Sequence, residues 1–259
     1  MKITILGSGA AGGVPMLSAG WGRCDPAEPK NRRRRPSILV ETGGRTILVD
    51  TSPDLREQLL SAGVRHLDAV LFTHAHADHL HGIDDLREVN RAMRAPIDIY
   101  ASETTLAEIR ERFGYVLEPL DPTVMPIFKP WLVPHVIDGP FELAGMTIVP
   151  FDQDHGFSRT TGYRFGNAAY STDVVEMPEE SFACLAGLDV WIVGCLMDVP
   201  HPTHAHVAKA RSWAQRLRPR RTWITHMGPK LDYRTLCDTL PEGVAPAYDG
   251  LVIEVADCL

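Results

Sequence analysis

The sequence predicts an α/β sandwich of two sheets covered on the outside by helices, and three observations support this prediction. Segments typical of strands and helices follow the order strands, helix, strand, helix, and this order occurs twice, which favours two packed sheets over one doubly wound sheet. The strand-like segments are β-branched or aliphatic and end in Gly, Asp, Asn or His. With 259 residues, 44% hydrophobic and 23% charged content, and no long linker, the chain is expected to form a single domain over 1–259.

The individual elements follow from local composition. We expect strands at residues 3–6, 37–41, 46–50, 69–72, 97–100, 146–150, 161–165, 190–193, 221–225 and 251–255. Helices are expected at residues 53–62, 81–95, 104–113, 206–216 and 233–239. Ser102 is the expected N-cap of the third helix, with Thr105 in its first turn.

A proline-rich segment interrupts this order at 117–140. Six prolines occur within it, at Pro119, Pro122, Pro126, Pro130, Pro134 and Pro140. Prolines this dense predict an irregular excursion, which we interpret as an insertion or a lid.

Composition also indicates where in the cell the protein is expected. The first seven residues resemble a strand and a glycine turn instead of a signal peptide, and no apolar run is long enough to span a bilayer. The cysteines are scattered and odd in number, which suits a reducing compartment: Cys24, Cys184, Cys195, Cys237 and Cys258. We therefore expect a cytoplasmic protein with no membrane partner. The net charge of −7 argues against nucleic acid as a general partner.

The most informative stretch follows the apolar strand at 69–72. His74, His76, Asp78 and His79 are four ligand-type residues within six positions. His74 and His76 can project from one side of an extended segment, whereas Asp78 and His79 fall where the chain turns into a helix and can reach a second point. Imidazole and carboxylate together select zinc, manganese or iron over calcium. One motif therefore supplies partial ligand sets for two ions.

Three later residues complete the predicted ligand set. A hydrolytic site keeps positions open for water, so its remaining protein ligands must come from elsewhere in the chain. His155 and Asp173 each follow a strand-like segment, and His226 ends another. A single histidine or aspartate at such a position is more often a cap or surface group, but beside the first motif we predict metal binding.

Other histidines receive different interpretations. His66 and His135 are expected to be surface or packing residues, and His81 could begin a helix or line the pocket wall.

The motif His-x-His-x-Asp-His, matched in full by residues 74–79, resembles the signature of the metallo-β-lactamase superfamily. The resemblance extends from Gly7 to the closing strand and implies the αββα four-layer sandwich of that fold. It implies that one metal binds His74, His76 and His155. It also implies that a second metal binds Asp78, His79 and His226, with Asp173 bridging both.

Within the superfamily, the chain is most similar to the phosphoribosyl cyclic phosphodiesterases of the PhnP type, which belong to the carbon-phosphorus lyase pathway. The supporting motifs are Gly7, Ser8 and Gly9 with Gly13, Val14 and Pro15, then Asn31, Arg32 and Arg33, and then His201, Pro202, Thr203 and His204. The resemblance implies a catalytic histidine, which we align with His204, although His201 and His206 stay open.

The sequence departs from the PhnP pattern at one place. Typical members hold a structural zinc with an N-terminal cysteine cluster and a histidine after the last metal ligand. Here only Cys24 remains, and Met227, Gly228 and Pro229 follow His226. We therefore predict that there is no structural zinc.

These features predict a dinuclear metal-dependent phosphodiesterase that hydrolyses a small ribose phosphate, cyclic or not, or a nucleotide by attack of a metal-bridging hydroxide. The expected cofactors are two divalent ions, Zn²⁺ or Mn²⁺. Asp78 would orient the attacking hydroxide, and His204 would supply a proton to the leaving oxygen, a role typically worth about 10² to 10⁴-fold.

Several alternatives stay open at this point. An RNA-end processing nuclease, a β-lactamase or a thioesterase would share the motif, and a PqqB-like cofactor-biosynthesis protein could bind metal without phosphodiesterase activity. The presence of every expected ligand favours an enzyme. The run Arg32 to Arg35 could bind phosphate or be a solvated loop, and Tyr248 and Asp249 could line a ribose pocket. The resemblance also suggests a homodimer.

Overall fold

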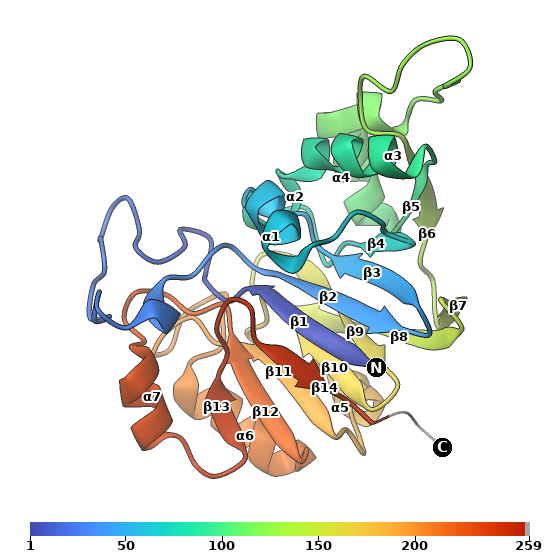
Figure 1. The fold of residues 1–259 in the computed structure, drawn as a ribbon. Helices are drawn as coiled ribbons and strands as arrows, with labels where there is room; N and C mark the ends of the chain where they lie inside the picture. Colours follow the sequence, from blue (N-terminus) through green and yellow to red (C-terminus); the bar gives the residue numbers. More distant parts are fainter. Residues whose placement is uncertain (257–259) are drawn as a thin grey trace.

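Two seven-stranded sheets pack face to face in the computed structural model, which describes residues 1–256, and helices cover both outer faces (Figure 1). In spatial order, the first sheet contains β14 (Val252–Glu254), β1 (Lys2–Gly7), β2 (Ser37–Thr42), β3 (Arg45–Val49), β4 (Ala69–Leu71), β5 (Ile97–Ala101) and β6 (Leu132–Val136). The second contains β13 (Val244–Pro246), β12 (Arg221–Thr225), β11 (Val190–Gly194), β10 (Ala168–Ser171), β9 (Arg159–Phe165), β8 (Met146–Asp154) and β7 (Phe141–Leu143). The predicted αββα sandwich is confirmed.

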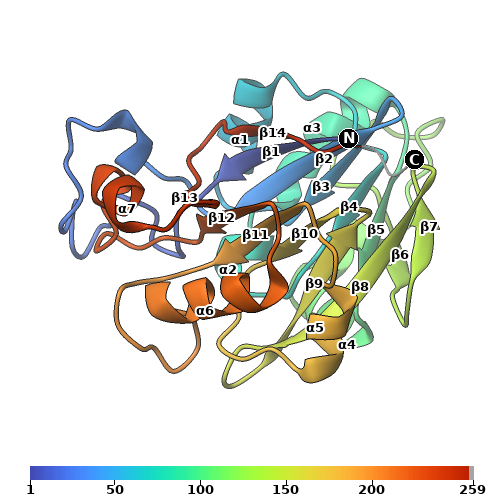
Figure 2. The same ribbon diagram turned by 90° about the horizontal axis from the view of Figure 1, so that it is seen from below.

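The helices divide between the two sheets. Those associated with the first sheet are α1 (Leu55–Ala62), α2 (Ala77–Leu80), α3 (Leu86–Met93) and α4 (Glu103–Phe113), with the 3₁₀ turns η2 (Ile83–Asp85) and η3 (Gly114–Leu117). Those on the second sheet are α5 (Glu179–Cys184), α6 (Val207–Leu217) and α7 (Tyr233–Thr239), and η1 (Pro29–Asn31) lies in the loop after β1. Figure 2 shows α1 and α3 on one side of the paired sheets and α5 and α6 on the other.

The strand directions determine where side chains for chemistry can gather. Strands β3 to β6 are parallel to one another, and so are β10 to β13. Because parallel strands end at the same edge of a sheet, the loops that follow them lie together.

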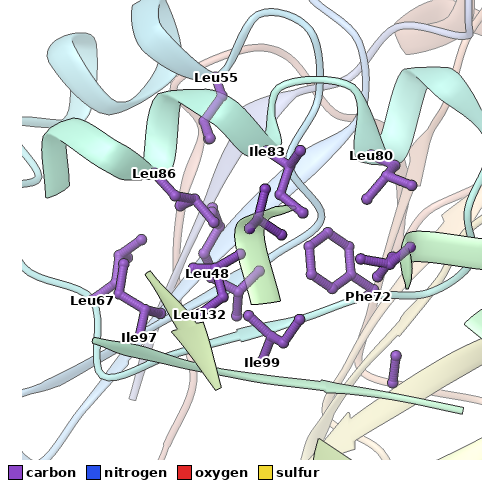
Figure 3. Close-up of a cluster of buried hydrophobic side chains, with 14 of the residues drawn as sticks. Leu48, Leu55, Leu67, Phe72, Leu80, Ile83, Leu86, Ile97, Ile99 and Leu132 are labelled. Carbon is purple, nitrogen blue, oxygen red and sulfur yellow. The ribbon is translucent and has the colours of Figure 1, made fainter. Parts of the chain in front are cut away.

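Three layers of core hold the sandwich together, and the alternation of side chains along a strand separates them. On β3, Ile47 and Val49 belong to the core between the sheets, whereas Leu48 belongs to the core under the helices. Figure 3 shows Leu55 and Leu86 pointing from helices toward Leu48 in that second core. Each fully buried aliphatic side chain contributes roughly 1.5–3 kcal/mol through burial.

The predicted excursion at 117–140 is only partly irregular. Residues 118–131 form no helix or strand, but β6 follows and pairs with β5. Pro134 is tolerated because β6 is the edge strand of its sheet. The loop projects at the top of Figure 1, and hydrogen bonds from Arg91 to the Ile127 carbonyl (2.7 Å) and from Arg87 to the Phe128 carbonyl (3.3 Å) hold it against α3. It is an insertion on the helical layer.

The helix predicted at 81–95 is present but shorter. The chain is helical from the 3₁₀ turn η2 at residue 83 to the end of α3 at residue 93, and the separate short helix α2 precedes it. A Cβ at Gly82 would lie 2.0 Å from the Ser52 carbonyl oxygen, so the backbone packs directly on the loop after β3 at this break. The predicted cap of α4 is confirmed, because Ser102 accepts a hydrogen bond from the Thr105 amide at 3.2 Å.

The list of expected elements also lacked β7, β10, β13 and α5, although β10 was implied as the strand-like segment before Asp173. The four cysteines within residues 1–256 are free thiols, and Cys258 lies outside the described residues. None of the helices in this part of the chain is long and apolar enough to cross a membrane.

Candidate metal centre

The histidine-rich motif spans the turn between β4 and α2. His74 follows the strand, His76 is the N-cap of α2, and Asp78 and His79 lie within the helix. His74, Asp78 and His79 are buried, whereas His76 is exposed. Because the chain changes from extended to helical here, the side chains of His74 and His76 point in a different direction from those of Asp78 and His79.

The remaining predicted ligands come from the second sheet, where His155 follows β8, Asp173 follows β10 and His226 follows β12. The structure brings all seven predicted residues together in two clusters, and the ligand atoms within each cluster lie within 4.8 Å of one another. One cluster is His74, His76, His155 and Asp173, and the other is Asp78, His79, Asp173 and His226. Asp173 belongs to both.

The two clusters meet at the Asp173 carboxylate. His79 Nε2 lies 2.8 Å from Oδ2, His226 Nε2 lies 2.9 Å from Oδ1, and His74 Nε2 lies 3.2 Å from Oδ2. His74 Nε2, His79 Nε2 and Asp173 Oδ1 are nevertheless buried without a hydrogen bond of acceptable geometry among the described residues. Buried polar atoms normally have partners, so this convergence is compatible with binding divalent metal ions.

Asp50 is a further residue of the candidate centre, which the sequence analysis missed. Its Oδ2 lies 2.6 Å from His79 Nδ1 and accepts a hydrogen bond from Thr73 Oγ1, while Oδ1 accepts one from the Thr73 amide. The carboxylate is fully buried and orients the His79 ring with Nε2 toward Asp173. The available signal was an aspartate that ends a strand shortly before the motif.

Backbone strain concentrates at this edge of the sheets. Asp50, Asp173 and His226 all have positive φ angles, of 64°, 48° and 56°. Non-glycine residues seldom adopt this conformation, and where they do, surrounding contacts must hold them.

The buried carboxylates of the centre require positive charge nearby. Burial would raise the pKa of Asp173, but His226 and His79 hold it well below its usual value. Burial would lower the pKa of His79, but the carboxylates of Asp78, Asp173 and Asp50 raise it well above its usual value. In His155, burial dominates and lowers the pKa to about 4. Divalent cations could supply the positive charge that the clustered carboxylates require.

His204 lies against both clusters. Its Nε2 is 3.3 Å from Asp173 Oδ1, and its ring centroid is 4.8 Å from that of His155. Thr203 Oγ1 contacts His204 Nδ1 at 2.7 Å and fixes the ring orientation. Of the two alternatives, His201 lies behind His204, at 5.2 Å between centroids, and His206 is the N-cap of α6.

The other predicted histidines take ordinary positions. His66 is exposed near Asp68, and His135 stacks on Tyr100, as expected for surface and packing residues. His81 is the exposed C-cap of α2, and its ring contacts Phe113.

The suggested ribose pocket at Tyr248 and Asp249 is not supported for Asp249. Its carboxylate is engaged within the protein, because it accepts hydrogen bonds from the Ser8 amide and hydroxyl and from the Arg34 amide. Tyr248 lies beside Lys30, whose Nζ is 4.1 Å from the ring centroid.

Cys24 belongs to neither ligand cluster within residues 1–256. It is buried, and its thiol donates to the carbonyls of Pro229 and Leu231. The absence of a structural zinc stays a prediction.

Comparison with known proteins relates this geometry to a family. Residues 45–227 match the family described as the β-lactamase superfamily domain. A crystal structure described as a new diphosphatase from the PhnP family is 36% identical, with a TM-score of 0.89, over 100% of this chain and 99% of that one. The Zn²⁺-bound PqqB from Methylobacterium extorquens is 21% identical, with a TM-score of 0.75 over 98% and 100% of the two chains, and so shares the fold.

An octanoyltransferase of Porphyromonas gingivalis is 32% identical over 254 residues, which are 97% of this chain and 51% of that protein. The chain thus spans about half the length of the curated relatives it matches most strongly.

Proposed function

The chain belongs to the β-lactamase superfamily, and from this premise we propose that it is a dinuclear metal-dependent phosphodiesterase acting on a small ribose phosphate, cyclic or not, or on a nucleotide. One observation supports this proposal above all others: two ligand clusters share Asp173, and His204 lies beside the shared carboxylate. The similarity to a PhnP-family diphosphatase supports phosphoryl chemistry.

The ligand sets suit hydrolysis because neither is a closed tetrahedral cage of cysteines, and His76 leaves the first cluster accessible to solvent. When bound, two Zn²⁺ or Mn²⁺ ions supply Lewis acidity toward phosphoryl oxygens and lower the pKa of water. No protein nucleophile is then required.

The chain's own residues position and transfer protons. His204 Nε2 faces the centre while Nδ1 contacts Thr203, so the ring can donate a proton to a leaving ribose oxygen from Nε2. The Asp78 carboxylate lies at the same centre, with Oδ2 3.3 Å from His79 Nε2, and can accept a hydrogen bond from the attacking water.

A thioesterase is the second candidate, and the similarity to an octanoyltransferase over 97% of this chain favours testing it. A hydrolase of acyl thioesters would use the same activated water. Its leaving group would be a thiolate, which needs a proton donor less than an alkoxide does. Acyl thioesters therefore belong beside phosphate esters in the first assay.

The test is a hydrolysis assay on metal-reconstituted protein with metals counted per chain. The substrates are bis(p-nitrophenyl) phosphate, a 2′,3′-cyclic nucleotide, a nucleoside diphosphate ester and octanoyl coenzyme A. Asp173→Ala and His204→Ala test the centre, and His135→Ala is the matched histidine control outside it.

We expect about two metals per chain and turnover of a phosphate ester. Asp173→Ala should abolish it, and His204→Ala should lower kcat by about 10² to 10⁴-fold while both metals stay bound. Full metal loading with hydrolysis of octanoyl coenzyme A alone would replace the phosphodiesterase with the thioesterase. Full loading without any turnover would favour a PqqB-like role.

A further inference from the structure

The run of four arginines before β2 does not act as one unit. Arg33 points into the protein, whereas its neighbours face outward and take unrelated partners: Arg32 lies over the Trp21 ring, Arg34 donates to the Glu57 carbonyl and to Ser61, and Arg35 pairs with Asp54. A phosphate-binding cluster would direct several guanidinium groups to one point. The separate directions leave Arg33 as the residue that needs an explanation.

Arg33 is a buried cation with an exposed fraction of 2%. Its Nη1 donates to the Gly228 carbonyl at 3.3 Å and contacts Cys24 Sγ at 3.9 Å, and its Nη2 donates to the Leu231 carbonyl at 2.7 Å and to Asn31 Oδ1 at 3.1 Å. No carboxylate of residues 1–256 forms an ion pair with it. A guanidinium is costly to bury without an ion pair, so these neutral acceptors have to compensate for its desolvation.

The carbonyls that Arg33 binds belong to the loop that leaves the metal centre. Residues 227–231 directly follow His226, which holds a φ of 56°. The backbone of this loop is anchored by the Met227 amide on the Ser8 carbonyl and by the Gly228 amide on the Leu196 carbonyl. Arg33 binds the carbonyl oxygens of the same loop, where it adds to the Leu231 amide, which donates to the Gly228 carbonyl, and to the Cys24 thiol, which donates to the Leu231 carbonyl.

We propose that Arg33 is a positioning residue of the metal centre: its guanidinium is a built-in cation that holds residues 228–231 and thereby keeps His226 directed at the second cluster. The proposal rests on the metal-binding part of the proposed function and not on the substrate. Cys24 and Asn31 complete the same cage of acceptors around the guanidinium.

The experiment measures the affinities of both sites by titrating metal-free protein with Co²⁺ in competition with a chelator, and follows the visible absorption of the bound ion. Arg33→Met removes the charge and keeps the length of the side chain. Arg34→Met is the matched control from the same run, and Arg33→Lys restores a cation that can reach a carbonyl. His76→Ala, which removes a ligand of the first cluster alone, assigns the titration steps to the two sites.

We expect Arg33→Met to weaken the second site by about 10 to 100-fold and to leave the first site unchanged. Arg33→Lys should recover part of that loss, and Arg34→Met should bind as the unaltered protein does. Equal weakening of both sites, or no weakening, would overturn the proposal and leave Arg33 a general packing residue. If Arg33→Met does not fold, Arg33→Gln, which keeps an amide donor, replaces it. The metal affinities of the two sites are then compared in the same way.

This readout is independent of the reaction. If the protein binds two ions and hydrolyses no phosphate ester, the proposed activity is wrong, but the two metal sites can still be compared. If the protein binds no second ion, both proposals are wrong.

Discussion

Asp50 belongs to neither ligand cluster but contacts the ring of His79, which belongs to one of them. Its two carboxylate oxygens form hydrogen bonds with three groups, the Thr73 amide, the Thr73 hydroxyl and His79 Nδ1. Asp50→Asn keeps the size of the side chain, and asparagine tolerates the left-handed backbone at this position. The amide nitrogen cannot accept, so at least one of these donors loses its partner.

We expect Asp50→Asn to lower the affinity of the second site for metal by about 10 to 100-fold, measured by chelator competition. Asp98→Asn is the control, since Asp98 pairs with His135 away from the clusters. Unchanged affinity in Asp50→Asn would mean that packing alone holds the His79 ring.

The residues of the centre differ in how far sequence could predict them. His74, His76, Asp78 and His79 are local, so their density identifies them directly. His155 and Asp173 were predicted only because the motif was present, and the resemblance assigned them to particular ions, because only the fold brings strand ends so distant in sequence together. Asp50 acts only through His79, and no local pattern distinguishes it from a capping aspartate. Asp249 shows the converse, because it looked available and is engaged by Ser8 and Arg34.

At the scale of an element, α7 depends on its first residue. Asp232 is the N-cap, accepts a hydrogen bond from the Thr235 amide at 2.9 Å and also accepts one from the Asn31 side chain. We expect Asp232→Ala to lower the free energy of unfolding by about 1 kcal/mol at pH 7 in urea denaturation. Asp238→Ala, an exposed change near the end of the same helix, should be close to neutral.

The effect of Asp232 should depend on pH. Burial would raise the pKa of Asp232, but hydrogen bonds from the Thr235 and Asp25 amides outweigh it and lower the pKa from 3.8 to about 2. A lowered folded-state pKa stabilises the protein above the unfolded value, and this contribution is lost as the pH falls through about 2. The difference between Asp232→Ala and the unaltered protein should therefore shrink between about pH 4 and 2. A constant difference across that range would show that the ionised carboxylate is not what stabilises the cap.

The insertion at 118–131 tests whether the proline-rich segment is a lid. Val124 and Met125 are exposed at its tip, and its hydrogen bonds to Arg87 and Arg91 hold it on α3. We expect replacement of residues 121–126 by a short Gly-Ser linker to leave metal binding and kcat/KM within about twofold, because surface loops tolerate such changes. A large rise in KM with both metals retained would support the lid interpretation instead.

Element boundaries were harder to predict than element types. The prolines of 117–140 indicated irregular chain and concealed β6, because an edge strand accepts Pro134. The helix expected at 81–95 starts only after Gly82, which packs on Ser52, a tertiary contact with no local signature. The cap at Ser102 was predicted because capping depends on a few adjacent residues.

At the scale of the whole molecule, the order of elements predicted the sandwich but not the pairing of distant strands. The first strand pairs with the last, since β1 lies between β14 and β2. The sequence does not show this pairing, because many strands are apolar along their whole length and lack a partner-specific pattern. The two sheets then meet mainly through apolar packing and, at one edge, through the two clusters of ligand-type side chains.

Because the ligands come from both sheets, bound metal should stabilise the folded chain as a whole. His74, His76, Asp78 and His79 follow β4 of the first sheet, whereas His155, Asp173 and His226 follow strands of the second. An ion that binds only the folded state stabilises it by about 4 kcal/mol when its free concentration is roughly 1,000 times Kd. For a chain of this size, each kcal/mol shifts Tm by about 2–4 °C.

We therefore expect chelation to lower Tm in differential scanning calorimetry by about 8 °C or more for each tightly bound ion, and returning Zn²⁺ or Mn²⁺ to restore it. Asp173→Ala removes the ligand common to both clusters, so chelator should shift its Tm by far less. An equal shift in Asp173→Ala would mean that the stabilising ion binds elsewhere on the chain. A Tm insensitive to chelator in both proteins would mean that the convergence of seven side chains at this edge does not bind metal tightly enough to join the two sheets.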